Sequence, residues 1–256
     1  MPTMGALHVG HTSLIDASVA AGYETVVTIF VNPLQFGPNE DLSRYPRTLE
    51  ADLELCRQHG AKAVFLPSVE EMYPKGAKSL VTVQELTDRW EGAHRPGHFD
   101  GVTTVVMKLF QIVQPDVAFF GAKDYQQQLV IRQMVTDLNL PVEIVTEPTV
   151  REPDGLAMSS RNRYLSAKDR QLAVRLSEGL QMVKTAAENG RRDVAAISQE
   201  LNQFYAQFPT INVEYAALVD GQTLEPATKD CSNVVAIVAA KIGSTRLIDN
   251  MTVWTE

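Results

Sequence analysis

The apolar run at residues 25–31, TVVTIFV, constrains the fold more than any other segment of this chain. Six of its seven residues are β-branched, and such side chains favour strands over helices. A strand that lacks polar alternation is typical of a parallel sheet buried on both faces. Shorter strand-like runs follow at 63–66, 117–120 and 142–145. The first part of the chain therefore predicts a buried parallel sheet.

Helix-like segments lie between these strand-like runs. Gly22 and Gly60 each follow such a segment, where glycine commonly ends a helix. Alternation of strands and helices predicts an α/β domain in which helices cover a parallel sheet. The predicted helices span residues 11–21, 42–59, 102–113 and 126–138.

The pattern changes near residue 150. Two helical segments are followed by three strand-like ones, and Gly243-Ser244 between the last two indicates a hairpin. We therefore expect two domains, a Rossmann-like one at residues 1–149 and a smaller α+β one at 150–256. The elements predicted for the second domain are helices at 166–189 and 194–208 and strands at 213–219, 234–240 and 245–248.

Charge and cysteine content exclude several classes of protein. With 23 basic and 31 acidic residues the net charge is -8, which argues against a nucleic-acid binder. Cys56 and Cys231 are far apart, so neither a disulfide scaffold nor a zinc site is expected. The chain shows no signal-peptide pattern and no apolar run of about 18 residues. We expect a cytoplasmic protein that does not bind membranes.

Two histidines precede the first helix in the segment Leu7-His8-Val9-Gly10-His11. A helix N-terminus offers unpaired N–H groups and positive potential, which suit phosphate. Gly10 lets a flat ring or a backbone approach closely. The pattern favours a pair of imidazoles that hold the phosphates of a nucleotide. The alternative is two surface histidines in a loop.

Two further segments carry candidate phosphate ligands. Gly121-Ala122-Lys123-Asp124 follows a predicted strand, at the end of the sheet where ligands bind in open α/β folds. Lysine there can neutralise phosphate and aspartate can accept from ribose hydroxyls, although a solvated ion pair is the alternative. The second segment places two hydroxyls before two arginines, a combination that can wrap a triphosphate; its alternative is a capped turn. Its residues are Met158, Ser159, Ser160, Arg161, Asn162 and Arg163.

Amides follow the strongest strand, at Asn32 and Gln35. Among apolar neighbours they suit recognition of small hydroxyl and carboxylate groups. The alternative is turn chemistry, which explains Asn32-Pro33 well but Gln35 poorly. The segment at residues 95–101, RPGHFDG, precedes an apolar helix. It is interpreted either as a substrate loop or as a rigid connection.

Together these segments are more specific than any one of them. The chain resembles the pantothenate synthetases, or pantoate–β-alanine ligases, in the order and spacing of PTMGALHVGH, IFVNPLQF, YPRTLEADLE, RPGHFDGV, GAKDYQQ, DGLAMSSRNRYL and RLIDN. That family belongs to a superfamily with the nucleotidylyltransferases and class I aminoacyl-tRNA synthetases. The resemblance implies a Rossmann-like domain with a smaller C-terminal lid, assembled as a homodimer.

The resemblance also implies a reaction. ATP and pantoate give pantoyl adenylate and pyrophosphate, and β-alanine then releases pantothenate and AMP, with Mg²⁺ accompanying ATP and no metal held by the protein alone. His8, His11 and Lys123 are implied to be catalytic, with His11 as the proton donor. Asn32, Gln35 and Gln127 are implied to bind pantoate and β-alanine. The implied ATP ligands are Met4, Gly5, His8, Gly10, His11, Gly121, Lys123, Asp124, Val150, Met158, Ser159, Ser160 and Arg161.

The chain departs from the family pattern in a few places. Val9 stands where an acidic residue is common, and Ala122 where glutamate is common. Family members usually carry a helix and a strand before Pro2-Thr3, so the first strand of the sheet is expected to be missing. Two alternatives remain: a related adenylate-forming ligase or nucleotidylyltransferase with other substrates, and a non-catalytic nucleotide-binding protein.

Overall fold

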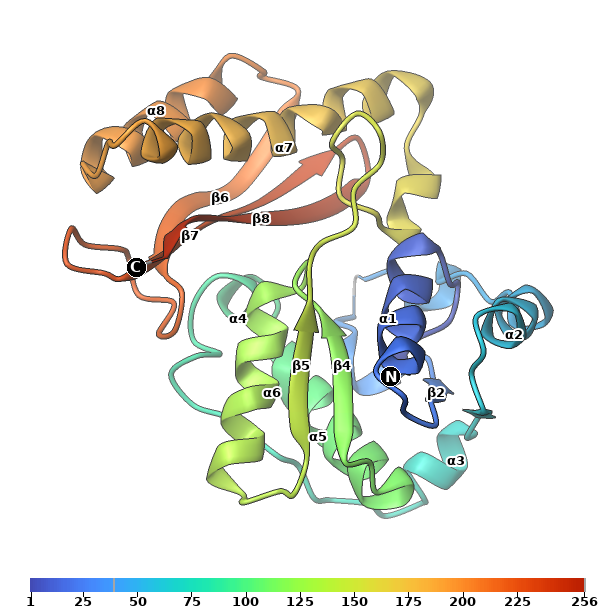
Figure 1. Ribbon diagram of the computed structural model, residues 1–256. Coiled ribbons are helices and arrows are strands. Elements are labelled where there is room, and N and C mark those ends of the chain that lie inside the picture. The colour runs from blue at the N-terminus through green and yellow to red at the C-terminus, as the bar shows by residue number, and fades with distance from the viewer. Residues whose placement is uncertain (39, 256) are drawn as a thin grey trace. The chain divides into compact units, whose positions relative to one another are not determined.

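The computed structural model describes residues 1–38 and 40–255. The chain divides into two compact units, unit 1 from Met1 to Thr149 and unit 2 from Val150 to Glu256 (Figure 1). In its described residues, unit 1 contains five strands, four helices of ten or more residues and several helices of a single turn. Its elements are β1 (Pro2–Thr3), α1 (Val9–Ala20), β2 (Val26–Ile29), η1 (Pro33–Gln35), η2 (Leu42–Arg44), α2 (Leu49–Gln58), β3 (Ala63–Phe65), α3 (Val69–Met72), α4 (Glu91–His94), α5 (His98–Val113), β4 (Val117–Gly121), α6 (Tyr125–Asp137) and β5 (Glu143–Glu147).

All strand pairs of unit 1 are parallel. β2 pairs with β1 on one side and with β3 on the other, and β4 pairs with β5. Hydrogen bonding thus forms one sheet of β1, β2 and β3 and a second of β4 and β5. Because β1 also contacts β4, the strands lie side by side in the order β3-β2-β1-β4-β5. This is the strand order of a Rossmann fold. The order reverses between the first and fourth strands, and this place is called the switch point of the sheet. The predicted fold class, a Rossmann-like parallel sheet with a smaller α+β unit, is confirmed.

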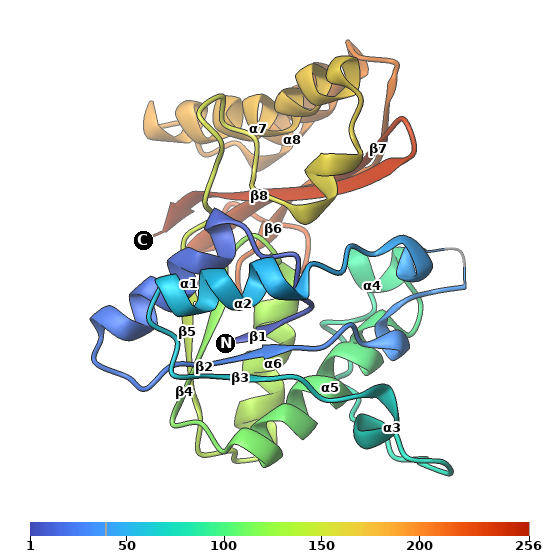
Figure 2. The same ribbon diagram turned by 90° about the vertical axis from the view of Figure 1, so that its right-hand side faces the viewer.

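Two separate cores cover the sheet of unit 1. Helices α1 and α2 pack against β2 through a small cluster that includes Ile15, Val27 and Cys56. Helices α5 and α6 pack against β4 through a larger cluster that includes Phe110 and Ile131. Figure 2 shows the sheet between these two pairs of helices. The buried strands therefore contact apolar side chains on both faces, as the run at residues 25–31 predicts.

The expectation that the first strand is missing is wrong for the described chain. Pro2 and Thr3 form β1, with Pro2 opposite Thr28 and Thr3 opposite Ile29. The N–H groups of Thr28 and Phe30 donate to the carbonyls of Met1 and Thr3 at 3.0 Å each. Backbone hydrogen bonds alone define so short a strand, and no periodicity of side chains could reveal it.

Two of the four helices predicted in unit 1 depart from the observed bounds by more than two residues. The predicted helix at 42–59 is divided into η2 and α2, because Pro46 has no N–H to continue a helix. The helix predicted at 102–113 begins earlier, at His98, after Gly97 with φ +77°. Glycine adopts this left-handed conformation without steric cost, so the chain can turn directly into α5.

Unit 2 is a three-stranded antiparallel sheet with two helices. Strand β7 is central and pairs with β6 and β8. Helices α7 and α8 pack against the sheet through a core that includes Leu176, Leu201 and Trp254. The elements are η3 (Ser160–Tyr164), α7 (Ala167–Glu188), α8 (Val194–Ala206), β6 (Ile211–Asp220), β7 (Asn233–Ile242) and β8 (Thr245–Thr255). No helix in residues 1–38 or 40–255 is long and apolar enough to cross a membrane.

Candidate functional site

The two histidines of the first motif lie at the start of helix α1. The ring of each accepts a hydrogen bond from a backbone N–H of this segment. His8 is the N-cap, and its Nδ1 accepts from the N–H of Gly10 at 3.1 Å. The N–H of His8 donates to Nδ1 of His11 at 3.3 Å, and the two ring centroids lie 4.1 Å apart. The two histidines are therefore not independent surface side chains in a loop.

This arrangement fixes the tautomer of both rings. Since Nδ1 of each imidazole accepts from a backbone N–H, the neutral ring carries its proton on Nε2. Burial lowers the pKa of His11 to about 4, with Asp124 acting to raise it and Lys123 to lower it. At neutral pH His11 is thus uncharged, and its Nε2–H is a hydrogen-bond donor rather than a cation.

Strand β4 ends at Gly121, beside the strand that precedes the histidines. Within the described residues, a Cβ at Gly121 would meet nothing within 4 Å, so there is open space at this strand end. Lys123 and Asp124 follow, and Lys123 Nζ lies 3.6 Å from Asp124 Oδ1. The predicted ion pair is therefore present. Asp124 is the N-cap of α6 but makes no capping hydrogen bond with its side chain, so its carboxylate is not committed to the helix.

The histidine loop and the Lys123 loop thus meet at one place. Each follows one of the two adjacent strands at which the chain reverses direction, the position where ligands bind in open α/β sheets. The charges of Lys123 and Asp124 reach His11 strongly enough to affect its pKa. Segments separated by more than 100 residues therefore form one polar centre in unit 1.

Asn32 and Gln35 lie at the end of β2 and contact each other. Asn32 is 1% exposed and donates from Nδ2 to Gln35 Oε1 at 3.1 Å and to the carbonyl of Gly101 at 2.9 Å. Its Oδ1 accepts from the hydroxyl of Tyr73 at 2.8 Å. Gln35 Nε2 lies 3.1 Å from the sulfur of Met4. Asn32 therefore orients the side chain of Gln35. The side-chain carbonyl of Gln35 is occupied by Asn32, and the NH₂ group of Gln35 faces Met4.

The segment at residues 95–101 forms a rigid connection that supports Gln35. Arg95 makes a bidentate ion pair with Glu40, at 2.8 and 2.7 Å. His98 Nδ1 lies 2.8 Å from the backbone carbonyl oxygen of Gln35, and His98 Nε2 lies 3.0 Å from Arg95 Nη1. Arginine can only donate, so Nε2 accepts and the proton of His98 is on Nδ1. Of the two interpretations, the structure supports the rigid connection.

Five of the predicted ATP ligands belong to unit 2: Val150, Met158, Ser159, Ser160 and Arg161. Met158 N–H donates to the carbonyl of Val150 at 2.9 Å, and Arg151 pairs with Ala157, so this stretch is a hairpin with its turn at Gly155. Arg151 fastens the hairpin through a bidentate ion pair with Asp249, at 2.8 and 3.0 Å. Ser159 then caps η3 by accepting from the N–H of Arg161 at 3.3 Å, and Ser160 and Arg161 begin that helix. The capped turn is therefore present, and an ATP-binding role for this segment remains a prediction.

Gln127 and Gly10 occupy helix positions. Gln127 lies in the first turn of α6, two residues after its start, and is partly buried. Gly10 lies in the first turn of α1 between the histidines, and Gly5 lies in the loop before them. Reasoning from sequence missed Tyr73, whose hydroxyl donates to Asn32, and Asp52, which accepts from the N–H of Ala6. The signal for Asp52 was an acid on the same face of α2 as the buried Cys56.

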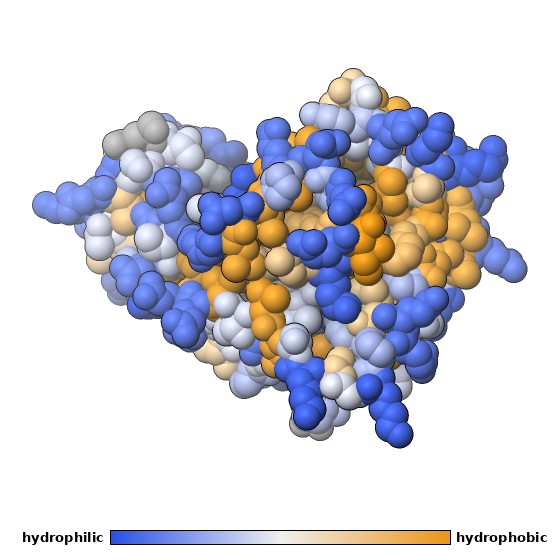
Figure 3. Space-filling view, turned by 90° about the horizontal axis from the view of Figure 1, so that it is seen from below, coloured by the Kyte–Doolittle hydropathy of each residue, from blue (hydrophilic) through white to orange (hydrophobic). Residues whose placement is uncertain are grey.

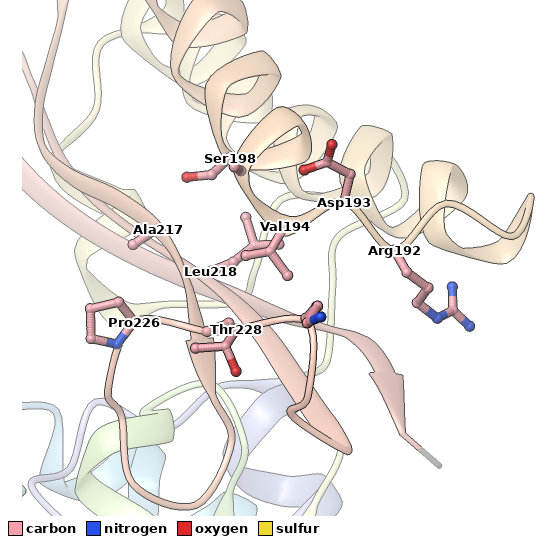
Figure 4. A pocket seen from close by; sticks show the side chains of 11 residues that line it. Arg192, Asp193, Val194, Ser198, Ala217, Leu218, Pro226 and Thr228 are labelled. Carbon is pink, nitrogen blue, oxygen red and sulfur yellow. The ribbon is translucent and has the colours of Figure 1, made fainter.

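Unit 2 holds a cavity of about 730 Å³ between α8, β6 and the loop at 226–229 (Figure 4). Val194, Ala217, Leu218 and Pro226 are among the side chains that line it. None of the predicted ATP or substrate residues lies in its wall, so it is not the candidate site. Within residues 1–38 and 40–255, no group of three or more His, Cys, Asp or Glu side chains is placed to hold a metal ion.

The buried His98 predicts acid sensitivity of unit 1. Burial, and secondarily the charge of Arg95, lowers the pKa of His98 to about 4 from 6.5. The unfolded chain therefore takes up a proton first, and the free energy of unfolding should fall as the pH drops from about 7 towards 4. His98→Asn keeps a donor near the Nδ1 position but cannot titrate. Urea unfolding at several pH values should show roughly 2–3 kcal/mol less acid destabilisation in this variant; an unchanged pH dependence would contradict the assignment.

Comparisons with known proteins agree over the whole chain. The model of the family described as pantoate-beta-alanine ligase matches residues 1–252. The chain is 51% identical over 251 residues to pantothenate synthetase from Moorella thermoacetica, covering 98% of this chain and 89% of that protein.

Solved structures give the same result. A pantothenate synthetase from Thermus thermophilus superposes with a TM-score of 0.96 at 48% identity, covering 99% of this chain and 92% of that one. The enzyme from Francisella tularensis, solved with β,γ-ATP and β-alanine, superposes with a TM-score of 0.79 at 34% identity, covering 98% and 88%. These findings do not favour a related ligase or nucleotidylyltransferase with other substrates. The Rossmann strand order, the paired histidines at its switch point and these relatives together establish that the chain belongs to the pantoate–β-alanine ligase family.

Proposed function

We propose that this chain condenses (R)-pantoate with β-alanine in an ATP-dependent reaction, through a pantoyl adenylate, and releases AMP and pyrophosphate. The observation that carries the proposal is the polar centre formed by His8, His11 and Lys123 at the switch point of a Rossmann sheet. Two N–H donors and one cation at this place match the needs of a nucleotide phosphate.

In the first step, a carboxylate oxygen of pantoate attacks the α-phosphorus of ATP, and the bond to the β-phosphate bridging oxygen breaks. This step needs alignment and charge stabilisation more than a strong base. The Nε2–H groups of His8 and His11 donate to phosphate oxygens, and Lys123 supplies positive charge. Because His11 is neutral, its contribution is a hydrogen bond that strengthens as charge accumulates on the phosphate, and it supplies a proton only if the leaving oxygen needs one.

Mg²⁺ enters as part of the substrate. The ion binds reluctantly to proteins and keeps several waters, so ATP phosphates and one or two side chains suffice to hold it. Asp124, whose side chain does not cap its helix, accepts from the ribose hydroxyls or from water on the ion. Met4, Gly5, Gly10 and Gly121 contribute backbone or close approach to the nucleotide.

In the second step, the amine of β-alanine attacks the acyl carbon of the adenylate, and AMP leaves as the amide bond forms. An acyl adenylate hydrolyses readily, so water must be excluded. We assign this to unit 2 acting as a lid, with Val150 near adenine and an arginine-bearing segment near the phosphates. The residues of that segment are Met158, Ser159, Ser160 and Arg161.

Gln35 and Gln127 bind pantoate. The side-chain carbonyl of Gln35 accepts from Asn32, so the NH₂ group of Gln35 is the part that meets a substrate hydroxyl or carboxylate. Asn32 itself contacts Gly101 and Tyr73, and we therefore assign it to orienting Gln35 beside the substrates. The amide of Gln127 reaches pantoate from the first turn of α6.

The assembly is proposed to be a homodimer in the cytoplasm. Leu49, Leu80 and Ile112 are among the exposed large apolar side chains of unit 1. Figure 3 shows that apolar side chains gather between charged ones on the face seen from below. Such a face suits burial between subunits. Sedimentation velocity of the purified chain gives the mass; a monomer at micromolar concentration would contradict the dimer.

The test of the function is an assay of AMP release with MgATP, pantoate and β-alanine, each omitted in turn. AMP should form only with all three, and pyrophosphate should form in a single turnover without β-alanine. Equal turnover with another acid or another amine would point to a different substrate pair. Complete inactivity of folded protein would favour a non-catalytic nucleotide-binding role.

Removal of the His11 ring should act on kcat. His11→Ala should lower kcat by roughly 10²–10⁴, as removal of a positioned donor does, while the affinity for ATP changes little. His11→Gln is the matched control, because its amide nitrogen lies near the position of Nε2 and should retain more of the rate. A His11→Ala enzyme with near-normal kcat, or a Gln variant no better than Ala, would rule out the donor role.

Lys123 and Arg161 should matter for adenylate formation more than for amide formation, since pyrophosphate leaves before β-alanine attacks. Supplying synthetic pantoyl adenylate should restore most of the pantothenate formation in Lys123→Ala and Arg161→Ala. Lys62→Ala, which removes an exposed lysine that is paired with Glu24, serves as the control and should be fully active with ATP. If both variants stay equally slow with the intermediate, their assignment to phosphate is wrong.

A further inference from the structure

Asp52 of helix α2 lies buried beneath the loop that precedes the histidines. Asp52 is only 1% exposed. Oδ2 accepts from the N–H of Ala6 at 2.9 Å, and Oδ1 accepts from the N–H of Leu7 at 2.8 Å. The hydroxyl of Thr48 donates to Oδ1 at 3.1 Å. Both carboxylate oxygens are therefore used by the chain itself, and they hold a loop that is 45 residues away in sequence.

The loop that Asp52 holds has an unfavourable backbone. Gly5 has φ +80° and Ala6 has φ +52°, and a left-handed conformation is costly for a residue with a Cβ. Ala6 is fully buried. A Cβ at Gly5 would come within 3.0 Å of Asp52 Oδ2 and of Ile29 Cγ2. The loop therefore packs directly on the carboxylate, and such a conformation persists only where surrounding contacts fix it.

The position of this loop determines the position of the histidines. Leu7 is the residue before His8, whose backbone starts helix α1 and donates to His11 Nδ1. A shift of Ala6 and Leu7 would therefore move both rings. We propose that Asp52 is a positioning residue of the reaction: its carboxylate clamps residues 5–7 so that the Nε2–H groups of His8 and His11 point to the nucleotide phosphates.

The proposal deepens the proposed function and rests on it for the target of the two donors. It is a geometric effect rather than an electrostatic one. The charges that shift the pKa of His11 are those of Asp124 and Lys123, with burial as the larger cause. Loss of the Asp52 carboxylate should therefore change the rate without changing the protonation state of His11.

The test compares Asp52→Asn with Cys56→Ala in the full chain. The amide of Asn keeps the shape of the carboxylate but accepts at one oxygen only, and its NH₂ group faces a backbone N–H. Cys56 lies one turn further along the same buried face of α2 and belongs to the same core cluster as Leu7. Its truncation therefore weakens that core but leaves the hydrogen bonds from Ala6 and Leu7 to Asp52 in place. In Asp52→Asn, kcat for pantothenate should fall roughly 10- to 100-fold with less than about a threefold change in KM for β-alanine. In Cys56→Ala, kcat should stay within about twofold of the wild-type value, even where the melting temperature falls as much as in Asp52→Asn.

Amide hydrogen exchange gives a readout that needs no substrate. Peptides covering residues 4–9 should exchange at least about tenfold faster in Asp52→Asn than in the wild type, and at the wild-type rate in Cys56→Ala. If Asp52→Asn does not fold, Thr48→Val, which removes only the hydroxyl contact, should show the same changes at a smaller size, about two- to fivefold in kcat.

The outcomes separate the two proposals. An inactive wild type with slow exchange at residues 4–9 would defeat the proposed function and leave the clamp standing. An active wild type whose Asp52→Asn variant keeps its kcat within about twofold, or whose loop exchanges no faster, would overturn the clamp alone. A loss of kcat matched by Cys56→Ala at equal melting temperature would reduce Asp52 to a structural residue.

Discussion

The parallel pairing of Pro2 and Thr3 with β2 is the interaction on which the site depends. These few backbone hydrogen bonds place β1 between β2 and β4. The chain leaves β1 directly into the loop of Gly5 to Leu7 and then into α1. The neighbouring strand β4 leads directly into the loop that contains Lys123. If β1 were displaced, both loops would remain in the sequence but would no longer share one strand switch point.

Around this point, unit 1 holds its polar side chains by donors and acceptors whose roles are fixed. Backbone N–H groups occupy Nδ1 of His8 and of His11, so each ring presents Nε2–H. Arg95 occupies Nε2 of His98, so that ring donates from Nδ1 to the carbonyl of Gln35. Histidines of the same unit thus adopt opposite tautomers for different tasks. Buried imidazoles stay neutral here because charging them would cost desolvation energy that no close carboxylate offsets fully.

Several polar residues that look like ligands in the sequence are committed to the protein. Asn32 uses its amide to orient Gln35 and to hold Gly101 and Tyr73. Ser159 caps the short helix η3 by accepting from the N–H of Arg161. Such side chains fix the positions of their neighbours. A motif therefore contains both the groups that act and the groups that hold them, and residue type alone does not distinguish the two.

The sequence by itself determined the α/β alternation, the division near residue 150 and the family, because β-branched runs, helix-terminating glycines and the spacing of whole motifs are local properties of the chain. Only the tertiary structure decided that Pro2 and Thr3 are a strand and that Asp52 lies under the histidine loop. Each of these depends on a partner distant in sequence or on backbone hydrogen bonds. A short strand carries no periodicity, and a buried carboxylate is recognisable only when the N–H groups that satisfy it are in place.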